Sequence, residues 1–307
     1  MLSRRYLLLI LVMMAGWLDL VAQPSEVLAD SLVTEKIKEE AKDSGFIKAY
    51  CLVMGEGPAS YSVCGHVALR LVCAAKGLDY CFTFEVDMHT SSRLDVLMRS
   101  GKAGFVYVPT RMFLRQYREE GRSVTQYELN LLPEQKQNLW RTLDEQVKGG
   151  PQWTFDVQNI NCVSMANFAI NTAIQPSRMA CGQQSRVLLY ENEEQLKKTL
   201  SQAPWYSSFF VRFLLLGTDG QKFHTEDLLL PRVYGDVLTT MYIIDETGQK
   251  RPLIKGNAQA LVQQTYKSSP QWASLVLAVV LFVACICIVV WIIRKRKNKN
   301  IVKHKKG

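Results

Sequence analysis

Short apolar stretches separated by turn residues dominate the first half of the chain. Residues 47–54, 66–73 and 80–86 are rich in aliphatic, β-branched and aromatic side chains, as buried strands are. The sequence AAKG at 74–77 leaves room only for a tight turn, so the second and third stretches should form an antiparallel hairpin. Further strands or short apolar elements are expected at 104–108, 124–131, 154–157, 228–231 and 241–244.

Helical spacing marks three other segments. Residues 31–42 are charged with sparse apolar positions, which predicts a solvated helix, and residues 133–147 place large apolar side chains on one helical side. A third helix is expected to begin at Cys162, with Asn161 as its N-cap. Helices combined with antiparallel hairpins predict an α+β domain instead of alternating βαβ units.

The N-terminus has the pattern of a secretory signal peptide. Arg4 and Arg5 precede the apolar residues 6–18, and the small residue Ala22 stands where cleavage would occur. Residues 1–22 are therefore predicted to be a signal peptide, with an uncleaved N-terminal anchor as the alternative.

A second apolar stretch lies near the C-terminus. Residues 272–293 carry no charge, and as a helix they would measure about 33 Å, enough for a hydrocarbon core of about 30 Å. Trp272 and Trp291 stand where interfacial aromatic residues are expected. The basic tail 294–307 would face the cytoplasm by the positive-inside rule, which puts the preceding domain outside. Residues 255–271 are mostly polar and are predicted to be the linker.

The same tail explains the formal net charge of +9, since eight lysine and arginine residues follow residue 293. A buried core helix, the alternative to a membrane span, rarely ends in so many cations. The predicted extracytoplasmic domain, residues 23–254, is close to neutral and has no basic patch, which excludes nucleic acid as a partner.

Two residues have the sequence context of catalytic groups. His66 opens a predicted strand directly behind Gly65, which allows another segment to approach the ring. Cys162 would be the first residue of a helix, where unpaired N–H groups lower a thiol pKa and can bind an oxyanion. A strand-initial histidine facing a helix-initial cysteine is the arrangement of a thiol acyl-transfer site. Taken alone, each residue has a simpler interpretation: a packed core histidine and half of a disulfide.

A third catalytic residue would orient the imidazole from the neighbouring strand. Folding the predicted hairpin about Ala75 and Lys76 places Glu85 across from His66. A one-residue slip in register would hand this role to Asp87 or remove it.

The predicted exported domain holds six cysteines, which three disulfides could use completely. Cys73 and Cys81 flank the hairpin turn and could pair, and a free Cys162 would leave at least one more free thiol. Cys64 and His66 lie two residues apart, but no second pair follows at zinc-site spacing, and the sequence lacks a glycine-rich phosphate loop. We therefore expect no metal and no organic cofactor. The six cysteines are Cys51, Cys64, Cys73, Cys81, Cys162 and Cys181.

Several motifs in this order and spacing make the chain resemble the Lnb N-terminal periplasmic domain family of bacteria. The motifs are YSVCGHVALRL (61–71), YREEGR (117–122), YELNLLPEQ (127–135), Asn161-Cys162, Pro204-Trp205, LLLGTDG (214–220), LLLPRV (228–233) and RPLI (251–254).

This resemblance implies a circularly permuted papain-like fold in which the histidine strand precedes the cysteine helix. The family's GH motif corresponds to Gly65-His66 and its Asn-Cys motif to Asn161-Cys162. Family members are linked to N-acylation of bacterial lipoproteins. The chain departs from the family at Val163-Ser-Met165, which follows the cysteine, and at TFEVD (83–87), so the resemblance does not support Glu85.

The resulting hypothesis is a membrane-anchored, extracytoplasmic acyltransferase that uses Cys162, His66 and Glu85. Its acyl donor would be a membrane lipid or a lipoprotein, and its acceptor the N-terminus of a lipoprotein. Two alternatives remain open at this point. One is a cell-wall cysteine peptidase or amidase with the same site, and the other a non-catalytic binding module held by disulfides.

Overall fold

The computed structural model describes residues 47–182 except 58, 60, 93–94, 97–99 and 158, residues 194–216 and 230–267, and a few residues between 276 and 288. The predicted signal peptide 1–22, the predicted helix 31–42, most of the predicted span 272–293 and the tail 294–307 lie outside the described residues. Among the residues described, no helix has the length and apolar character needed to cross a membrane.

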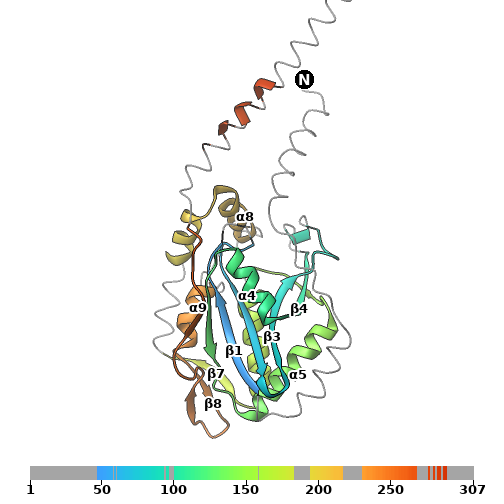
Figure 1. The fold of residues 1–307 in the computed structure, drawn as a ribbon, viewed down its shortest axis with the longest axis vertical. Coiled ribbons are helices and arrows are strands. Elements are labelled where there is room, and N and C mark those ends of the chain that lie inside the picture. Colours follow the sequence, from blue (N-terminus) through green and yellow to red (C-terminus); the bar gives the residue numbers. More distant parts are fainter. Residues whose placement is uncertain are drawn as a thin grey trace, which may run out of the picture.

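A seven-stranded antiparallel sheet forms the centre of the domain (Figure 1), with the strand order β10-β5-β1-β2-β3-β4-β6. Its strands confirm the predicted stretches near 47–54, 66–73, 80–86 and 104–108. The predicted strand 154–157 is nearly absent, because Thr154 alone in that range pairs with β4. The strands are β1 (Ile47–Met54), β2 (His66–Cys73), β3 (Leu78–Val86), β4 (Lys102–Pro109), β5 (Val124–Glu128), β6 (Trp153–Thr154) and β10 (Gln259–Val262).

The hairpin of β2 and β3 has the predicted register. A short 3-10 turn, Ala74–Lys76, and Gly77 with φ of +66° reverse the chain between the two strands. Glycine suits this left-handed conformation because it has no Cβ. The pairing ends at Ala68 opposite Thr83. The same register, continued by two residues, puts His66 opposite Glu85.

The strand β10 corrects the predicted boundary between domain and linker. It lies within residues 255–271 and pairs with β5, with Gln259 opposite Gln126. Val262 is buried against the core on one face of the sheet, which explains why this polar stretch joins the fold. The folded domain therefore extends beyond residue 254.

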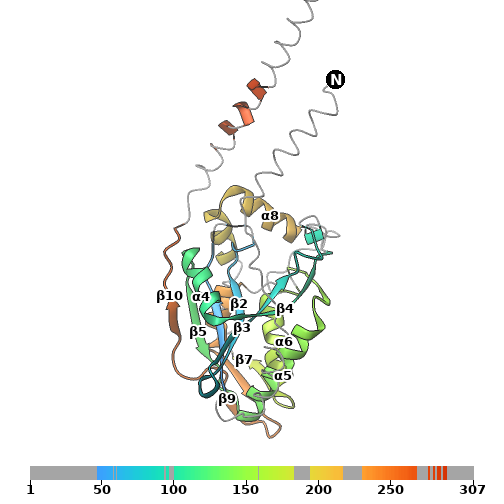
Figure 2. The same cartoon turned by 45° about the vertical axis from the view of Figure 1, so that its right-hand side comes forward.

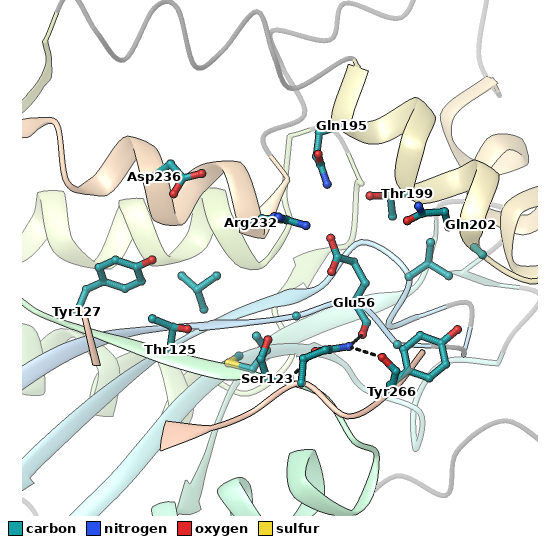
Figure 3. Close-up of a pocket in the computed structure, with 17 residues that line it drawn as sticks. Glu56, Ser123, Thr125, Tyr127, Gln195, Thr199, Gln202, Arg232, Asp236 and Tyr266 are labelled. Atoms are coloured by element: carbon teal, nitrogen blue, oxygen red, sulfur yellow. Dashed lines mark hydrogen bonds between the residues drawn. The ribbon is translucent and has the colours of Figure 1, made fainter. Parts of the chain in front are cut away.

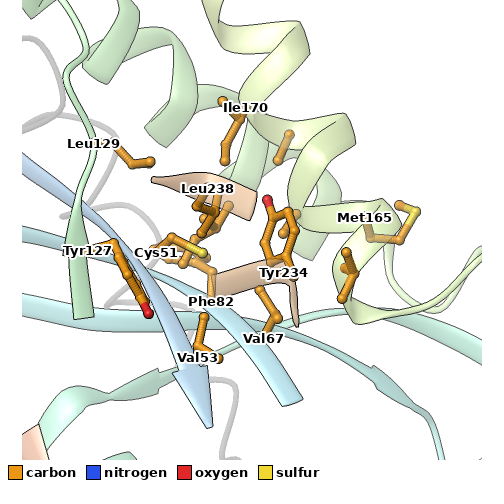
Figure 4. Packing of buried hydrophobic residues seen from close by; sticks show 14 of the residues in the cluster. Cys51, Val53, Val67, Phe82, Tyr127, Leu129, Met165, Ile170, Tyr234 and Leu238 are labelled. Atoms are coloured by element: carbon orange, nitrogen blue, oxygen red, sulfur yellow. The ribbon is translucent and has the colours of Figure 1, made fainter. Parts of the chain in front are cut away.

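Helices cover both faces of the sheet (Figure 2), and the predicted α+β class is confirmed. One face packs on α4, which the sequence analysis did not predict. The other face packs on α5, α6 and α9. Figure 4 shows side chains of α6 and α9 beside those of β1 and β2. The helices are α4 (Thr110–Glu119), α5 (Pro133–Gly149), α6 (Cys162–Ile174), α8 (Trp205–Leu216) and α9 (Pro231–Leu238).

Of the apolar run 228–231, predicted as a strand or a short apolar element, Leu230 and Pro231 are described, and they introduce a helix. Pro231 is the first residue of α9, a position where its fixed φ and missing N–H suit a helix. A second, three-stranded sheet has the order β7-β8-β9, in which β7 precedes α9 in the chain and the other two strands follow it. The strand predicted at 241–244 is confirmed there. These strands are β7 (Arg178–Cys181), β8 (Met241–Ile244) and β9 (Lys250–Pro252).

Candidate functional site

Cys162 is the first residue of α6, as predicted, and Asn161 is the N-cap. The Asn161 side-chain oxygen accepts hydrogen bonds from the backbone N–H groups of Val163, at 2.9 Å, and Ser164, at 3.0 Å. The Ser164 hydroxyl in turn accepts a hydrogen bond from the Asn161 N–H at 2.9 Å. This reciprocal capping fixes the first turn of α6, and with it the direction of the Cys162 side chain.

The Cys162 thiol lies against the start of β2. The backbone N–H groups of Val67 and Val163 face its sulfur and act to lower the thiol pKa. Burial nevertheless raises the pKa of the Cys162 thiol to about 11, and these N–H groups only oppose the shift. The expectation of a lowered thiol pKa is therefore wrong, because loss of solvation outweighs the helix N-terminus. The cysteine is a neutral thiol at neutral pH.

His66 is half-buried at the first position of β2 and is held by a buried hydroxyl. Its Nε2 atom lies 2.5 Å from the hydroxyl oxygen of Thr83. Burial, together with the nearby positive charge of Arg122, lowers the pKa of His66 to about 3. The imidazole is therefore neutral at physiological pH, and one of its ring nitrogens carries no proton.

The Thr83 hydroxyl connects His66 to Glu85. Partial loss of solvation raises the pKa of Glu85, while a hydrogen bond with the Thr83 hydroxyl lowers it. Because a hydroxyl has one proton, Thr83 can donate to Glu85 and accept from His66 Nε2–H at the same time. In this arrangement the His66 Nδ1 atom is the free base. Glu85 thus contacts the imidazole only through Thr83, which the sequence analysis missed.

Asp87, the alternative third residue, has a different role. Its carboxylate accepts hydrogen bonds from the His89 N–H at 2.9 Å and the Thr90 hydroxyl at 2.5 Å. These bonds shape the turn after β3 and leave Asp87 outside the site.

The thiol and the imidazole approach the same strand end from opposite faces of the sheet. His66 and Thr83 alternate with the side chains that face α6, and so they share the α4 face with Ala68. The ladder between β2 and β3 stops at Ala68, which frees the Val67 N–H for Cys162. Within the described residues no hydrogen bond joins Cys162 directly to His66.

Arg122 is the buried charge beside this site. Its side chain is 2% exposed, stacks 4.6 Å from the Tyr117 ring centroid, and donates to the Gly55 carbonyl and the Glu120 carboxylate, both at 2.9 Å. Its Nη2 atom is buried without a partner in the described part of the chain. The positive charge lowers the pKa of both His66 and Cys162, so it disfavours a resting imidazolium.

All six cysteines of the domain are free, so the disulfides expected for the binding-module alternative are not formed. The expected pairing of Cys73 with Cys81 fails because the two side chains lie in the cores on opposite faces of the sheet. Across the described ranges no group of three histidine, cysteine or acidic side chains could hold a metal ion.

A cavity of about 530 Å³ lies beside the site (Figure 3), and its lining includes neither Cys162 nor His66. It is bounded by the end of β1, the start of β5, the helical residues 194–202 and α9. Gly57 and Val63, from the loop between β1 and β2, form part of its wall. Most of its other lining groups are carboxylates, amides, hydroxyls and one guanidinium: Glu56, Ser123, Thr125, Tyr127, Gln195, Thr199, Gln202, Arg232, Asp236, Gln264 and Tyr266.

A comparison with protein-family models matches residues 34–182 to the Lnb N-terminal periplasmic domain. The matched segment runs from before β1 to the end of β7 and contains both His66 and Cys162. Comparisons with curated proteins and with solved structures find no match.

Proposed function

We propose, for a chain that belongs through residues 34–182 to the Lnb N-terminal periplasmic domain family, the function of an extracytoplasmic thiol acyltransferase. The family places this domain in the bacterial periplasm. The reaction we propose moves an acyl chain from an ester to the N-terminus of a lipoprotein. A permuted papain-like relationship is part of the proposal, supported by the order of the His66 strand before the Cys162 helix.

In the first step Cys162 attacks the ester carbonyl of a membrane lipid or lipoprotein. The sulfur forms a bond to the carbonyl carbon while the His66 Nδ1 atom takes the thiol proton. The tetrahedral oxyanion would be stabilised by backbone N–H groups at the start of α6. The carbon–oxygen bond of the ester then breaks, and the leaving alcohol oxygen takes the proton from His66.

In the second step the acceptor amine attacks the thioester. The amine nitrogen bonds to the acyl carbon, His66 takes a proton from that nitrogen, and the carbon–sulfur bond breaks. The proton returns to the Cys162 sulfur. The products are an amide and the free thiol, and no cofactor is consumed.

One observation carries this proposal: the Cys162 thiol and the neutral His66 imidazole both lie at the start of β2, the thiol against the backbone of Val67 and the imidazole against Thr83. The Val67 N–H, adjacent in sequence to His66, faces the sulfur of Cys162. The Thr83 hydroxyl holds the far nitrogen of the same imidazole at 2.5 Å. A nucleophile, a base and a group that orients the base are the components of covalent acyl transfer.

Exposed apolar side chains support a location at the membrane. Phe209 of α8 is 65% exposed. The described residues between 276 and 288 are helical, and their large apolar side chains, such as Phe282 at 59%, are about half exposed. A single-pass anchor at 272–293 would hold the domain where ester-linked lipids and lipoproteins are both concentrated.

Mass spectrometry of lipoprotein N-terminal peptides tests the proposal. A bacterial host that lacks its own N-acylating enzyme should form N-acylated peptides when it expresses the wild-type chain. Cys162→Ser should reduce them by a factor of about 10² or more, since the hydroxyl is a much weaker nucleophile at neutral pH. If the Cys162→Ser chain still N-acylated lipoproteins at the wild-type level, the proposal would fail.

A cell-wall cysteine peptidase or amidase is the second candidate. The polar lining of the cavity beside the site favours it, because such a lining suits a peptide better than an acyl chain. Incubation of the full chain with purified muropeptides decides between the two. Cys162-dependent release of new amine ends would identify hydrolysis, and intact muropeptides would favour transfer.

A further inference from the structure

The cavity beside the site carries charged side chains that no described residue satisfies. Glu56 follows β1, and Arg232 and Asp236 stand one turn apart on α9 (Figure 3). None of these three side chains has a hydrogen bond or an ion pair within the described residues. Thr199 is only 7% exposed, and its hydroxyl points into the cavity without a partner in that same part of the chain. Arg232 and Asp236 are exposed and Glu56 is half-buried, so these charges are open to solvent and to a polar ligand.

The cavity shares a wall with the segment that holds His66. Gly57 and Val63 belong to the loop that enters β2 through Cys64. Burial, together with Cys162 and Glu56, raises the pKa of the Cys64 thiol to about 12. Cys64 therefore lies near both Cys162 and Glu56.

The packing of Gly65 brings α9 to the same place. A Cβ at Gly65 would lie 2.6 Å from the Met54 carbonyl oxygen and 3.2 Å from the Pro231 side chain. Pro231 directly precedes Arg232 on α9. The charged wall formed by α9 is thus fixed against the residue that precedes His66.

We infer that this cavity is the site where the free amino terminus of the acceptor peptide first binds, with the primary ammonium group at Glu56 and peptide carbonyls at Arg232, before the amine loses a proton and moves to the thioester on Cys162. The inference rests on the proposed acyl transfer, for which it supplies the acceptor site. The carboxylate of Glu56 can accept hydrogen bonds from an ammonium group and balance its charge. The guanidinium of Arg232 only donates hydrogen bonds, and peptide carbonyls accept them. The amides of Gln195 and Gln202 can pair with a peptide backbone in both directions.

The alternative occupant within the same reaction, the acyl chain, fits this cavity poorly. Hydrocarbon placed against Glu56, Arg232 and Thr199 would remove water from these groups without replacing its hydrogen bonds, which is costly. The volume of about 530 Å³ is typical of a site for a small ligand or a few residues of peptide. The acceptor's polar end therefore suits the cavity better than the acyl chain does.

Calorimetric titration of the full-length Cys162→Ser chain in detergent micelles tests this inference. The probe is the tetrapeptide Ser-Gly-Gly-Ser with a free α-amino group and an amidated C-terminus, compared with its N-acetyl form. The free amine should bind at least about tenfold more tightly, because acetylation removes the charge that pairs with Glu56. Glu56→Gln should abolish this preference, and Arg232→Gln should weaken both peptides. Glu145→Gln, an equal charge change on an exposed residue of α5 outside the cavity, should change neither.

Equal affinity for the free and acetylated peptides, or an unchanged preference in Glu56→Gln, would overturn the inference. Arg232 is exposed on α9, so Arg232→Gln gives a second result if Glu56→Gln does not fold. O-phosphoethanolamine is a lipid head group that carries the same ammonium group. If it bound to the cavity as tightly as the free-amine peptide, the cavity could not be assigned to the acceptor peptide. Because the Cys162→Ser chain forms no thioester, binding is read separately from catalysis. If the chain shows no preference for the free amine but the wild type still N-acylates lipoproteins, only this inference fails. If the preference is present but the wild type does not N-acylate lipoproteins, only the proposed function fails.

Discussion

The Nε2 atom of His66 and the hydroxyl oxygen of Thr83 lie 2.5 Å apart across the open end of the β2–β3 hairpin. Thr83 is fully buried, so the contact holds the imidazole in one orientation and directs its Nδ1 atom away from the hydroxyl. The hydrogen bond thus assigns the two ring nitrogens different roles, one structural and one as the base.

Replacing Thr83 tests this orientation. Thr83→Val keeps the shape of the side chain but removes the hydroxyl, so the ring loses its fixed position. We expect kcat for acyl transfer to fall by up to about 100-fold with little change in KM. Steady-state kinetics of the purified chain measure both constants. Thr83→Ser keeps the hydroxyl and should recover most of the activity, and equal losses in both variants would rule out an orienting hydrogen bond.

Glu85 and Asp87 can be separated by neutralising each carboxylate. Glu85→Gln weakens the acceptor for the Thr83 hydroxyl, and we expect kcat to fall by less than about tenfold, the value of one ordinary hydrogen bond. Asp87→Asn should leave kcat unchanged, since its carboxylate serves the turn at His89 and Thr90. A larger loss in Asp87→Asn than in Glu85→Gln would contradict this assignment.

The pKa values of the site predict an unusual pH dependence. With the pKa of His66 at about 3 and that of Cys162 at about 11, neither group changes charge around neutral pH. The rate of thioester formation should therefore be flat there, without the inflection near 6.5 that an ordinary histidine gives. Single-turnover rates with an ester donor measure this step before the acceptor amine takes part.

Acid should also destabilise the fold through the same histidine. The unfolded chain binds a proton to His66 near pH 6.5, whereas the folded chain resists it until about pH 3. A depressed pKa gives stability that is present above 6.5 and lost as the pH falls toward 3. As the pH falls over this range, the thermal unfolding temperature of the wild type should thus decrease more than that of His66→Gln. Parallel declines would mean that His66 has an ordinary pKa in the folded chain.

The N-cap of α6 links stability to the site. Asn161→Ala removes the acceptor for the Val163 and Ser164 N–H groups and should lower the free energy of unfolding by about 1 kcal/mol. Denaturant unfolding of this variant and of Asn161→Asp, which retains a capping oxygen, measures the difference. Equal losses in the two variants would show that the cap contributes little.

The register of the β2–β3 hairpin could be predicted because local turn chemistry sets it. Residues 74–77 allow only a short reversal, so the pairing of Arg70 with Cys81, and the position of Glu85, follow directly. The Asn161 cap was equally local. Thr83 does not follow from directly opposed pairs, because it lies diagonally across the hairpin from His66. Diagonal neighbours on one face of a sheet are also within reach of each other.

Features that depend on tertiary packing could not be predicted in this way. The thiol pKa of Cys162 depends on burial under the rest of the domain, which outweighs the helix N-terminus that the sequence revealed. The segment around Val262 looked like a linker because its composition is polar, yet pairing with β5 makes it a strand. Arg122 lay in a recognised motif, but its burial beside His66 appears only in the fold.

Intact-mass spectrometry of the chain after incubation with an ester-linked phospholipid tests the central claim, that Cys162 carries the acyl group. The account predicts a mass increase of one acyl chain, mapped to the peptide that contains Cys162 and removed by neutral hydroxylamine as a thioester is. The adduct should be absent in Cys162→Ala and strongly reduced in His66→Gln. N-acylation that proceeds without any acyl group on Cys162 would contradict the account.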